Sequence, residues 1–236
     1  MTEKKKEEMP VLIPEPVPLL KSRKGGVSSL IQAALLLEAT RMVDDGMDVP
    51  HIEAAAKKAF GISRGFLEWM DDKGISESVE YLFFLSESSG SEDPLSLVYD
   101  NFFTPGESCR KMLDRARAEH AKGIVKWISS EDAEKGAKDL LLLDLLVKRF
   151  KAVAFMVSAE VVDVGLIGMH DVETLCVASF QWMEGPFAMM NKMGIDEALR
   201  IVTERMELSH RKEINFPIPK LLIAQAQKNE PWPIKK

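Results

Sequence analysis

Apolar residues recur along most of the chain with the three- to four-residue spacing of helices that bury one face. Between residues 27 and 45, Leu30, Ala34 and Leu37 keep this spacing, and Gly46 follows as an expected helix C-cap. The same spacing predicts further helices at about 50–60, 65–73, 75–87, 95–103, 107–121, 132–164, 171–179, 187–193, 195–208 and 220–228. No stretch alternates apolar and polar residues as a half-buried strand does. The pattern therefore predicts an all-α protein.

The longest predicted helix, 132–164, is apolar nearly all round in its central part, which predicts burial on several sides. Its most apolar stretch, LLLLDLLV at 140–147, includes a charged aspartate. A membrane span needs about 20 apolar residues. We therefore expect 140–147 to be a buried helix of a soluble, cytoplasmic protein that does not enter a membrane.

Residues 1–25 have a different composition from the rest of the chain. A charge run is followed by four prolines within residues 10–18 and then by two glycines. Proline lacks an amide proton and disfavours helix in the residue before it. We expect an extended, Pro-rich arm over 1–25.

The remaining chain contains a repeat with a step of 120 residues. Matching pairs in one register are Glu53 and Glu173, Phe60 and Phe180, Gly65 and Gly185, Met70 and Met190, and Gly74 and Gly194. We predict a first helical repeat over 26–130 and a second over 131–236. The two repeats would pack about a pseudo-two-fold axis, because neither alone buries both faces of its long helix.

The net charge and the spacing of the cysteines argue against nucleic-acid binding and against a C-x-x-C site. The net charge of −6 and the pI near 5.4 argue against the clustered basic surface that nucleic-acid binding needs. Cys109 and Cys176 lie far apart and form no C-x-x-C motif, so we expect two buried free thiols.

The repeat also carries a recognisable set of motifs. Each copy has an acid after an apolar residue, a Gly-containing turn and a second glycine nine residues later. The motifs are Glu38-Ala39, Ile52-Glu53, Gly61, Gly65, Asp71 and Gly74 in the first copy, and Val172-Glu173, Gly185-Pro186-Phe187, Asn191 and Gly194 in the second. Over about residues 24–233, this order resembles the C-terminal domain of the 3-hydroxyacyl-CoA dehydrogenases of fatty-acid β-oxidation.

The resemblance implies an all-α domain that works beside a nicotinamide-binding domain. In that family, the catalytic His and Glu and the G-x-G-x-x-G turn for NAD lie in an N-terminal domain, and these 236 residues contain no matching glycine set. We expect no catalytic residue and no bound cofactor in this chain alone. NAD, His and Glu would come from a partner protein, and the resemblance suggests a homodimer through the helical domain.

The resemblance also implies where an acyl-CoA substrate would contact the chain. The cleft Asn of the family falls on Ser29 in the register of Glu38, and the shorter serine side chain reaches less far. Lys24 lies just before the first long helix, where a helix N-terminus favours phosphate, although a solvated basic linker is the commoner reading. Ser29 and Lys24 are the predicted substrate-binding residues.

Other motifs carry weaker chemistry. Glu207 and His210 have the E-x-x-H spacing of di-iron helices, but a second such pair is missing, so we expect a solvated helix end and no metal. His51, His170 and His120 are expected at the surface, and no G-x-S-x-G nucleophile elbow is present.

Two functions remain open. The chain is either the helical subunit of an NAD-dependent 3-hydroxyacyl-CoA dehydrogenase, inactive alone, or a non-catalytic acyl-CoA-binding or dimeric scaffold protein. Ser29 in place of Asn favours the second reading.

Overall fold

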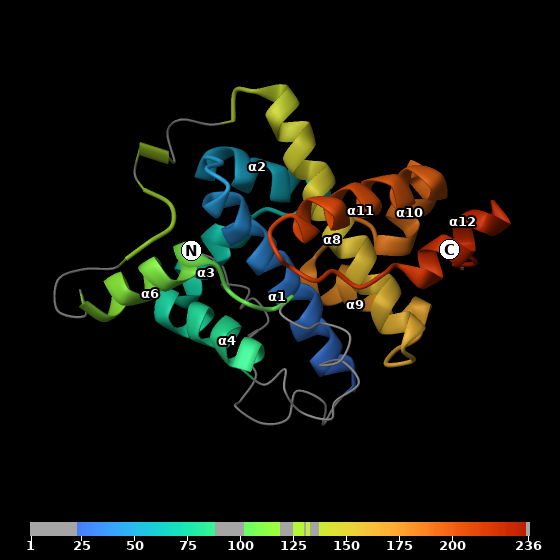
Figure 1. The fold of residues 1–236 in the computed structure, drawn as a ribbon, viewed down its shortest axis with the longest axis horizontal. Coiled ribbons are helices and arrows are strands. Elements are labelled where there is room, and N and C mark those ends of the chain that lie inside the picture. The colour runs from blue at the N-terminus through green and yellow to red at the C-terminus, as the bar shows by residue number, and fades with distance from the viewer. Residues whose placement is uncertain (1–22, 88–101, 119–124, 130, 133–136, 235–236) are drawn as a thin grey trace, which may run out of the picture.

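The computed structural model describes residues 23–87, 102–118, 125–129, 131–132 and 137–234. Within these ranges the chain forms ten helices and no strand (Figure 1). The predicted all-α class is confirmed. Part of the predicted helix at 95–103, the end of the one at 107–121 and residues 1–22 of the predicted arm lie outside the described residues. The last three residues of the arm, 23–25, were expected to be extended, and this is wrong, because they begin the first helix.

The N-terminal half contributes five of these helices. They are α1 (Arg23–Asp44), α2 (Val49–Phe60), α3 (Phe66–Lys73), α4 (Ile75–Glu87) and α6 (Glu107–Ala118). Pro50 at an early helical position favours the start of α2, and Gly61 in the left-handed region (φ 70°) ends it by donating its N–H to the Lys57 carbonyl. Local sequence therefore sets both ends of α2.

The C-terminal half contributes the other five. They are α8 (Leu140–Asp163), α9 (Met169–Phe180), α10 (Pro186–Met193), α11 (Ile195–His210) and α12 (Lys220–Lys228). The predicted bounds of α12 are confirmed, and those of α9 and α11 agree to within two residues.

The two long helices, α1 and α8, form the centre of the molecule. Helix α8 packs against α1, α2, α11 and α12, while α1 also contacts α3, α6 and α9 (Figure 1). The middle of α8 is buried on all sides, with Val153, Phe155 and Val157 fully inaccessible to solvent. The predicted burial of this central portion is confirmed.

The start of α8 differs from the prediction. The helix begins at Leu140 rather than 132, because the Asp139 side chain accepts hydrogen bonds from the backbone N–H groups of Leu141 and Leu142. Residues 137–139 are not helical, and the Asp139 N–H donates to Nε2 of His51 on α2. This cap and its contact with α2 fix the helix start.

The apolar stretch at 140–147 was predicted to be buried, and this is wrong for most of it. Leu141 is 85% exposed and Leu140 69%, while Leu146 is fully buried. In Figure 1 the first turns of α8 extend past α2. Within the described residues, none of the helices combines the length and apolar character needed to cross a bilayer.

The loops that follow α2 and α9 meet each other. The Met183 N–H donates to the Phe60 carbonyl at 2.9 Å, and the Phe60 and Trp182 rings stack at 4.2 Å between centroids. Phe66 and Phe150 complete this aromatic cluster. The packing joins the end of α2 to the second half of the chain. The proposed 120-residue repeat, its pseudo-two-fold axis and the domain limits at 25 and 130 stay predictions.

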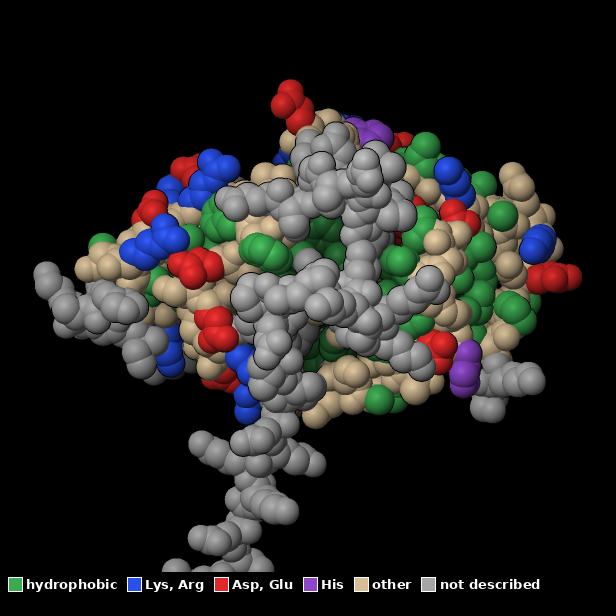
Figure 2. All heavy atoms as spheres, turned by 90° about the horizontal axis from the view of Figure 1, so that it is seen from below, with side chains coloured by type: hydrophobic (Ala, Val, Ile, Leu, Met, Phe, Trp, Pro, Cys, Tyr) green, Lys and Arg blue, Asp and Glu red, His purple; other side chains and the backbone are tan. Residues whose placement is uncertain are grey.

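The surface carries both charged and hydrophobic side chains, and the two cysteines lie in the interior. On the face shown in Figure 2, acidic and basic side chains of the described residues lie among one another, and hydrophobic side chains gather towards the middle and right. Cys109 and Cys176 are both free and buried, as predicted.

Candidate functional site

A buried carboxylate occupies the N-terminus of α3. Glu53, which is 6% exposed on α2, accepts a hydrogen bond from the backbone N–H of Leu67 at 2.8 Å. The carboxylate lies directly on Gly65, where an added Cβ would come within 2.2 Å of Oε2. Only glycine leaves room for this contact. The first N–H groups of a helix have no partner within the helix, so Glu53 satisfies one of them.

The same arrangement occurs at the N-terminus of α10. Glu173 on α9 accepts from the Phe187 N–H at 2.6 Å, and a Cβ on Gly185 would come within 2.4 Å of its carboxylate. Gly74 and Gly194, which end α3 and α10, have identical backbone angles (φ 97°, ψ 133°). Two segments 120 residues apart thus have one local geometry.

Both carboxylates have raised pKa values. Burial raises the pKa of Glu53 from 4.5 to about 7, although the backbone N–H groups of Leu67 and Glu68 oppose the shift. Burial likewise raises the pKa of Glu173, which is only half-buried. A carboxylic acid that titrates near neutrality can serve as a general acid or base. Here each one is held by a helix N-terminus and faces a glycine, so the geometry indicates a structural cap.

Glu53 also borders a surface cleft, in which the carboxylate of Asp71 is held by backbone N–H groups. Asp71 of α3 accepts hydrogen bonds from the N–H groups of Trp127 (2.6 Å) and Ile128 (3.0 Å). Burial raises the pKa of Asp71, and these two hydrogen bonds oppose the shift. The aspartate therefore attaches the 125–129 segment to α3.

The two predicted substrate residues lie on the first turns of α1. Ser29 is 6% exposed and interacts with the phenol of Tyr81 on α4, whose pKa burial raises to about 12. Lys24 belongs to the first turn of α1, but its side chain lies outside the described part of the structure. Their role in binding stays a prediction.

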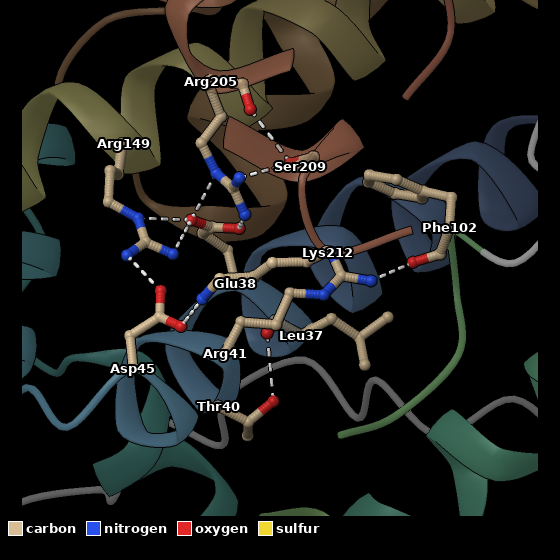
Figure 3. A network of polar contacts seen from close by, with 10 residues as sticks. All are labelled: Leu37, Glu38, Thr40, Arg41, Asp45, Phe102, Arg149, Arg205, Ser209 and Lys212. Carbon is tan, nitrogen blue, oxygen red and sulfur yellow. Dashed lines mark hydrogen bonds and ion pairs between the residues drawn. The ribbon is translucent and has the colours of Figure 1, made fainter. Parts of the chain in front are cut away.

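A second buried carboxylate, Glu38, lies in the middle of α1 and is surrounded by guanidinium groups (Figure 3). Arg205 of α11 binds it in a bidentate manner, with Nε to Oε1 at 2.8 Å and Nη2 to Oε2 at 2.6 Å. Arg149 of α8 donates to the same Oε1 at 2.8 Å. Burial raises the pKa of Glu38, but the two arginines outweigh this effect and lower it to about 2. Glu38 is therefore ionised at neutral pH and joins three helices.

The network extends to the surface at Lys212 and, on its other side, to the rings of Phe102 and Phe216. Arg149 donates through Nη1 to Asp45 at 2.8 Å, and Asp45 also pairs with Lys212 (Figure 3). Arg205 lies over the Phe216 ring at 4.9 Å. Arg41 donates to the Phe102 carbonyl. Glu38 and Asp45 each bind two basic side chains, so these contacts indicate a structural centre.

The remaining sequence candidates fall in separate places. Glu207 and His210 are exposed at the end of α11, and His170 is exposed at the start of α9. His120 lies outside the described residues. Within the described residues, no group of three or more His, Cys, Asp or Glu side chains could hold a metal ion.

His51 was predicted at the surface, and this is wrong. It is 8% exposed, its Nδ1 lies 2.7 Å from the Asp48 carboxylate, and its Nε2 accepts the Asp139 N–H. The ring connects α2 to the start of α8. A polar side chain that reaches a backbone group 88 residues away leaves no local pattern in the sequence.

The arginines that bind Glu38 were also missed. Arg149 and Arg205 lie 111 and 167 residues from Glu38, and each is one of many charged residues on its helix. The only sequence signal is indirect: Glu38 and Arg205 each interrupt the apolar face that its helix turns to the core. A charge at such a position predicts a partner.

Comparisons with known proteins support the sequence resemblance. Residues 25–119, which span α1 to α6, match the sequence model of the 3-hydroxyacyl-CoA dehydrogenase C-terminal domain. The structure is similar to that of 3-hydroxybutyryl-CoA dehydrogenase from Escherichia coli K12 substr. MG1655, with a TM-score of 0.61 and 14% sequence identity. A comparison with curated protein sequences gives no match.

These findings confirm the resemblance on which the fold prediction was based. The similarity to the dehydrogenase covers 85% of this chain but only 59% of that one. The described residues thus have the fold of a dehydrogenase-type helical domain, and they span little more than half of the enzyme to which they are similar.

Proposed function

We propose that this chain serves acyl-CoA metabolism of the β-oxidation type as the helical subunit or partner of a separate NAD-binding protein. The observation that carries the proposal is the family match across α1 to α6, together with a matching fold over most of the chain. In this proposal the helical domain supplies part of the acyl-CoA cleft. Ser29 would contact the acyl thioester or hydroxyl oxygen, and Lys24 a phosphate of CoA.

NAD is assigned to the partner because of the architecture of the described residues. Dinucleotides bind at the carboxyl ends of parallel strands in βαβ units, against a helix N-terminus that follows a Gly-rich turn. The described ranges consist of helices and loops. They offer no such unit, so we assign no step through NAD to these residues.

We further propose that the chain works in the cytoplasm and forms a homodimer through the helical domain. Two free thiols in the core suit a reducing compartment. Leu140, Leu141 and Leu145, all more than half exposed on the first turns of α8, would provide an apolar surface for a protein contact.

Thermal unfolding with acetoacetyl-CoA, free CoA and NAD, each added separately, tests the binding claim. A ligand that binds only the native state stabilises it by RT ln(1 + [L]/Kd), about 2.7 kcal/mol at a hundredfold excess over Kd. We expect the melting temperature to rise with acetoacetyl-CoA and to stay constant with NAD. Ser29→Ala should reduce the rise, and Ser108→Ala, a serine of α6, is the control. A chain that responds to NAD alone would contradict the proposal.

One observation favours the alternative, a non-catalytic binding or scaffold protein. Ser29 is almost fully buried against Tyr81, whereas a substrate-contacting side chain needs an accessible oxygen. As a scaffold, the protein would dimerise and show no thermal response to any of the three ligands, whereas a non-catalytic acyl-CoA-binding protein would respond to acetoacetyl-CoA as the dehydrogenase subunit does. The ligand titration therefore separates a scaffold from an acyl-CoA-binding protein, and sedimentation of the wild type and of Leu141→Glu tests the homodimer, which both functions include.

A further inference from the structure

His51 joins α2 to the start of α8, and both nitrogens of its ring make hydrogen bonds within the protein. Nδ1 lies 2.7 and 2.8 Å from the two carboxylate oxygens of Asp48, and Nε2 lies 3.0 Å from the backbone N of Asp139. The side chain is only 10% exposed, so water cannot easily replace either partner. The contact between the two helices therefore depends on which of the ring nitrogens carries a proton.

The two partners determine where that proton is. A backbone N–H can only donate, so Nε2 must be without a proton to accept from Asp139. An ionised carboxylate can only accept, so Nδ1 must carry the proton that faces Asp48. The observed contacts thus require a neutral imidazole with its proton on Nδ1.

A second proton on the ring removes the contact with α8. Nε2–H and the Asp139 N–H would then be two donors that face each other at 3.0 Å. The contact with Asp48 becomes stronger, because a charged imidazole donates more strongly to a carboxylate than a neutral one. Protonation therefore keeps His51 bound beside its own helix and releases the backbone of Asp139.

The other charged groups along this interface do not replace the lost contact. The Asp139 carboxylate accepts from two backbone N–H groups of the first turn of α8, so it could bind a protonated His51 only by uncapping that helix. Lys58 of α2 pairs with Asp144 of α8 at 2.7 Å, further along the same two helices. Glu53 on α2 is bound at the start of α3 instead. Either rearrangement of Asp139 loosens the first turn of α8.

We propose that His51 is a pH-operated latch between α2 and α8, closed when the ring is neutral and opened when it is protonated. Opening releases the first turns of α8, which carry the exposed side chains of Leu140, Leu141 and Leu145. Histidine is the residue whose charge changes between pH 5 and 8, so the latch responds to mild acidification. Its geometry involves neither predicted substrate residue, and the latch is therefore independent of the proposed acyl-CoA function.

Amide hydrogen exchange of the full chain, followed by NMR at pH 5 and pH 8, tests the latch. Protection factors are compared, because they remove the intrinsic pH dependence of exchange. The N–H groups of Leu141 and Leu142 bind the Asp139 carboxylate and report on the start of α8. We expect their protection factors to be about fivefold lower at pH 5, which corresponds to the loss of one hydrogen bond.

Two substitutions fix the latch in its two states. His51→Gln supplies a carbonyl oxygen that can accept the Asp139 N–H at either pH, so protection should stay high and lose its pH dependence. His51→Leu removes the acceptor, so protection should be low at both pH values. His170→Gln alters an exposed histidine of α9, and Glu53→Gln removes a group of α2 whose pKa burial raises to about 7. These two controls should keep the wild-type response.

The protonation of the His51 ring gives a second measurement, which needs no variant. The chain has four histidines, so its ring ¹H–¹⁵N correlations are few. We expect the proton on Nδ1 at pH 8 and protons on both nitrogens at pH 5. Three results would overturn the proposal: a proton on Nε2 at pH 8, equal protection of the first turn of α8 at the two pH values, or the wild-type pH response in both His51 variants.

Discussion

Glu38 and Glu53 are both almost fully buried, yet their pKa values shift in opposite directions. Glu38 is bound by two guanidinium groups, and its pKa falls to about 2. Glu53 is bound by the backbone N–H groups of a helix start, and its pKa rises to about 7. Burial alone raises both pKa values. The comparison shows that full positive charges can outweigh desolvation, whereas backbone dipoles offset only part of it.

The largest effect should come from removing a guanidinium from Glu38. Arg205→Leu leaves the buried carboxylate with Arg149 alone, and breaking a buried ion pair costs about 3–5 kcal/mol. We expect the free energy of unfolding, measured by urea denaturation at pH 7, to fall by this amount. Arg200→Leu, on the exposed face of the same helix, is the control and should have little effect. A loss of similar size in both variants would contradict the role of Arg205.

The opposite pKa shifts predict opposite pH dependences. Glu53 has a raised pKa, so its contribution to stability is full below pH 4.5 and is lost as the pH rises through 7. Glu38 has a lowered pKa, so its contribution is present above pH 4.5 and is lost as the pH falls towards 2. Each shift corresponds to on the order of 3 kcal/mol.

Urea denaturation across pH 3 to 8 would distinguish the contributions of Glu53 and Glu38 to the free energy of unfolding. Glu53→Gln should reduce the fall in unfolding free energy between pH 4.5 and 7 and leave the acid side unchanged. An unaltered profile in Glu53→Gln would mean that Glu53 keeps an ordinary pKa.

A methyl group at Gly65 should disrupt the Glu53 cap. Gly65→Ala places Cβ within 2.2 Å of the carboxylate, which must leave its hydrogen bond to the Leu67 N–H. The unsatisfied groups should cost about 1–3 kcal/mol, measured by thermal unfolding. Gly168→Ala is the control, because its Cβ would meet Asp171 at an ordinary 3.7 Å. If both alanine variants have the same melting temperature as the wild type, the close approach of Glu53 to Gly65 is not required for stability.

The smallest effect is expected at Glu173, which is held like Glu53 but is only half-buried. Its pKa is raised for the same reason, so Glu173→Gln should change the pH profile in the same direction as Glu53→Gln but by less. The double variant tests whether the two effects add. If Glu173→Gln changed the pH profile in the opposite direction, Glu53 and Glu173 would not cap their helices in the same way.

Much of the fold could be predicted from the sequence, because local signals set it. The bounds of α2 follow from Pro50 and Gly61, and those of α10 from Pro186 and Gly194. The start of α8 was misplaced because the charged segment 132–138 was taken as its first turns, whereas the Asp139 cap starts the helix at Leu140.

The candidate site was less predictable, since its contacts join distant parts of the chain. The motif that contains Glu38 was visible, but nothing near it points to Arg205, and nothing near His51 points to Asp139. The stacking of Phe60 on Trp182 likewise joins distant parts of the chain and depends on tertiary packing. Local patterns predict helices and their ends, whereas pairings across more than a hundred residues require the packed structure.

The separation of Glu38 from its partners has a consequence for synthesis on the ribosome. Arg205 is made 167 residues after Glu38, which at about 5–20 residues per second is a delay of roughly 8–30 s. During that interval a carboxylate in the middle of α1 lacks the guanidinium of Arg205 and keeps its water. The nascent N-terminal half therefore stays hydrated and incompletely packed around Glu38 until α11 has left the exit tunnel.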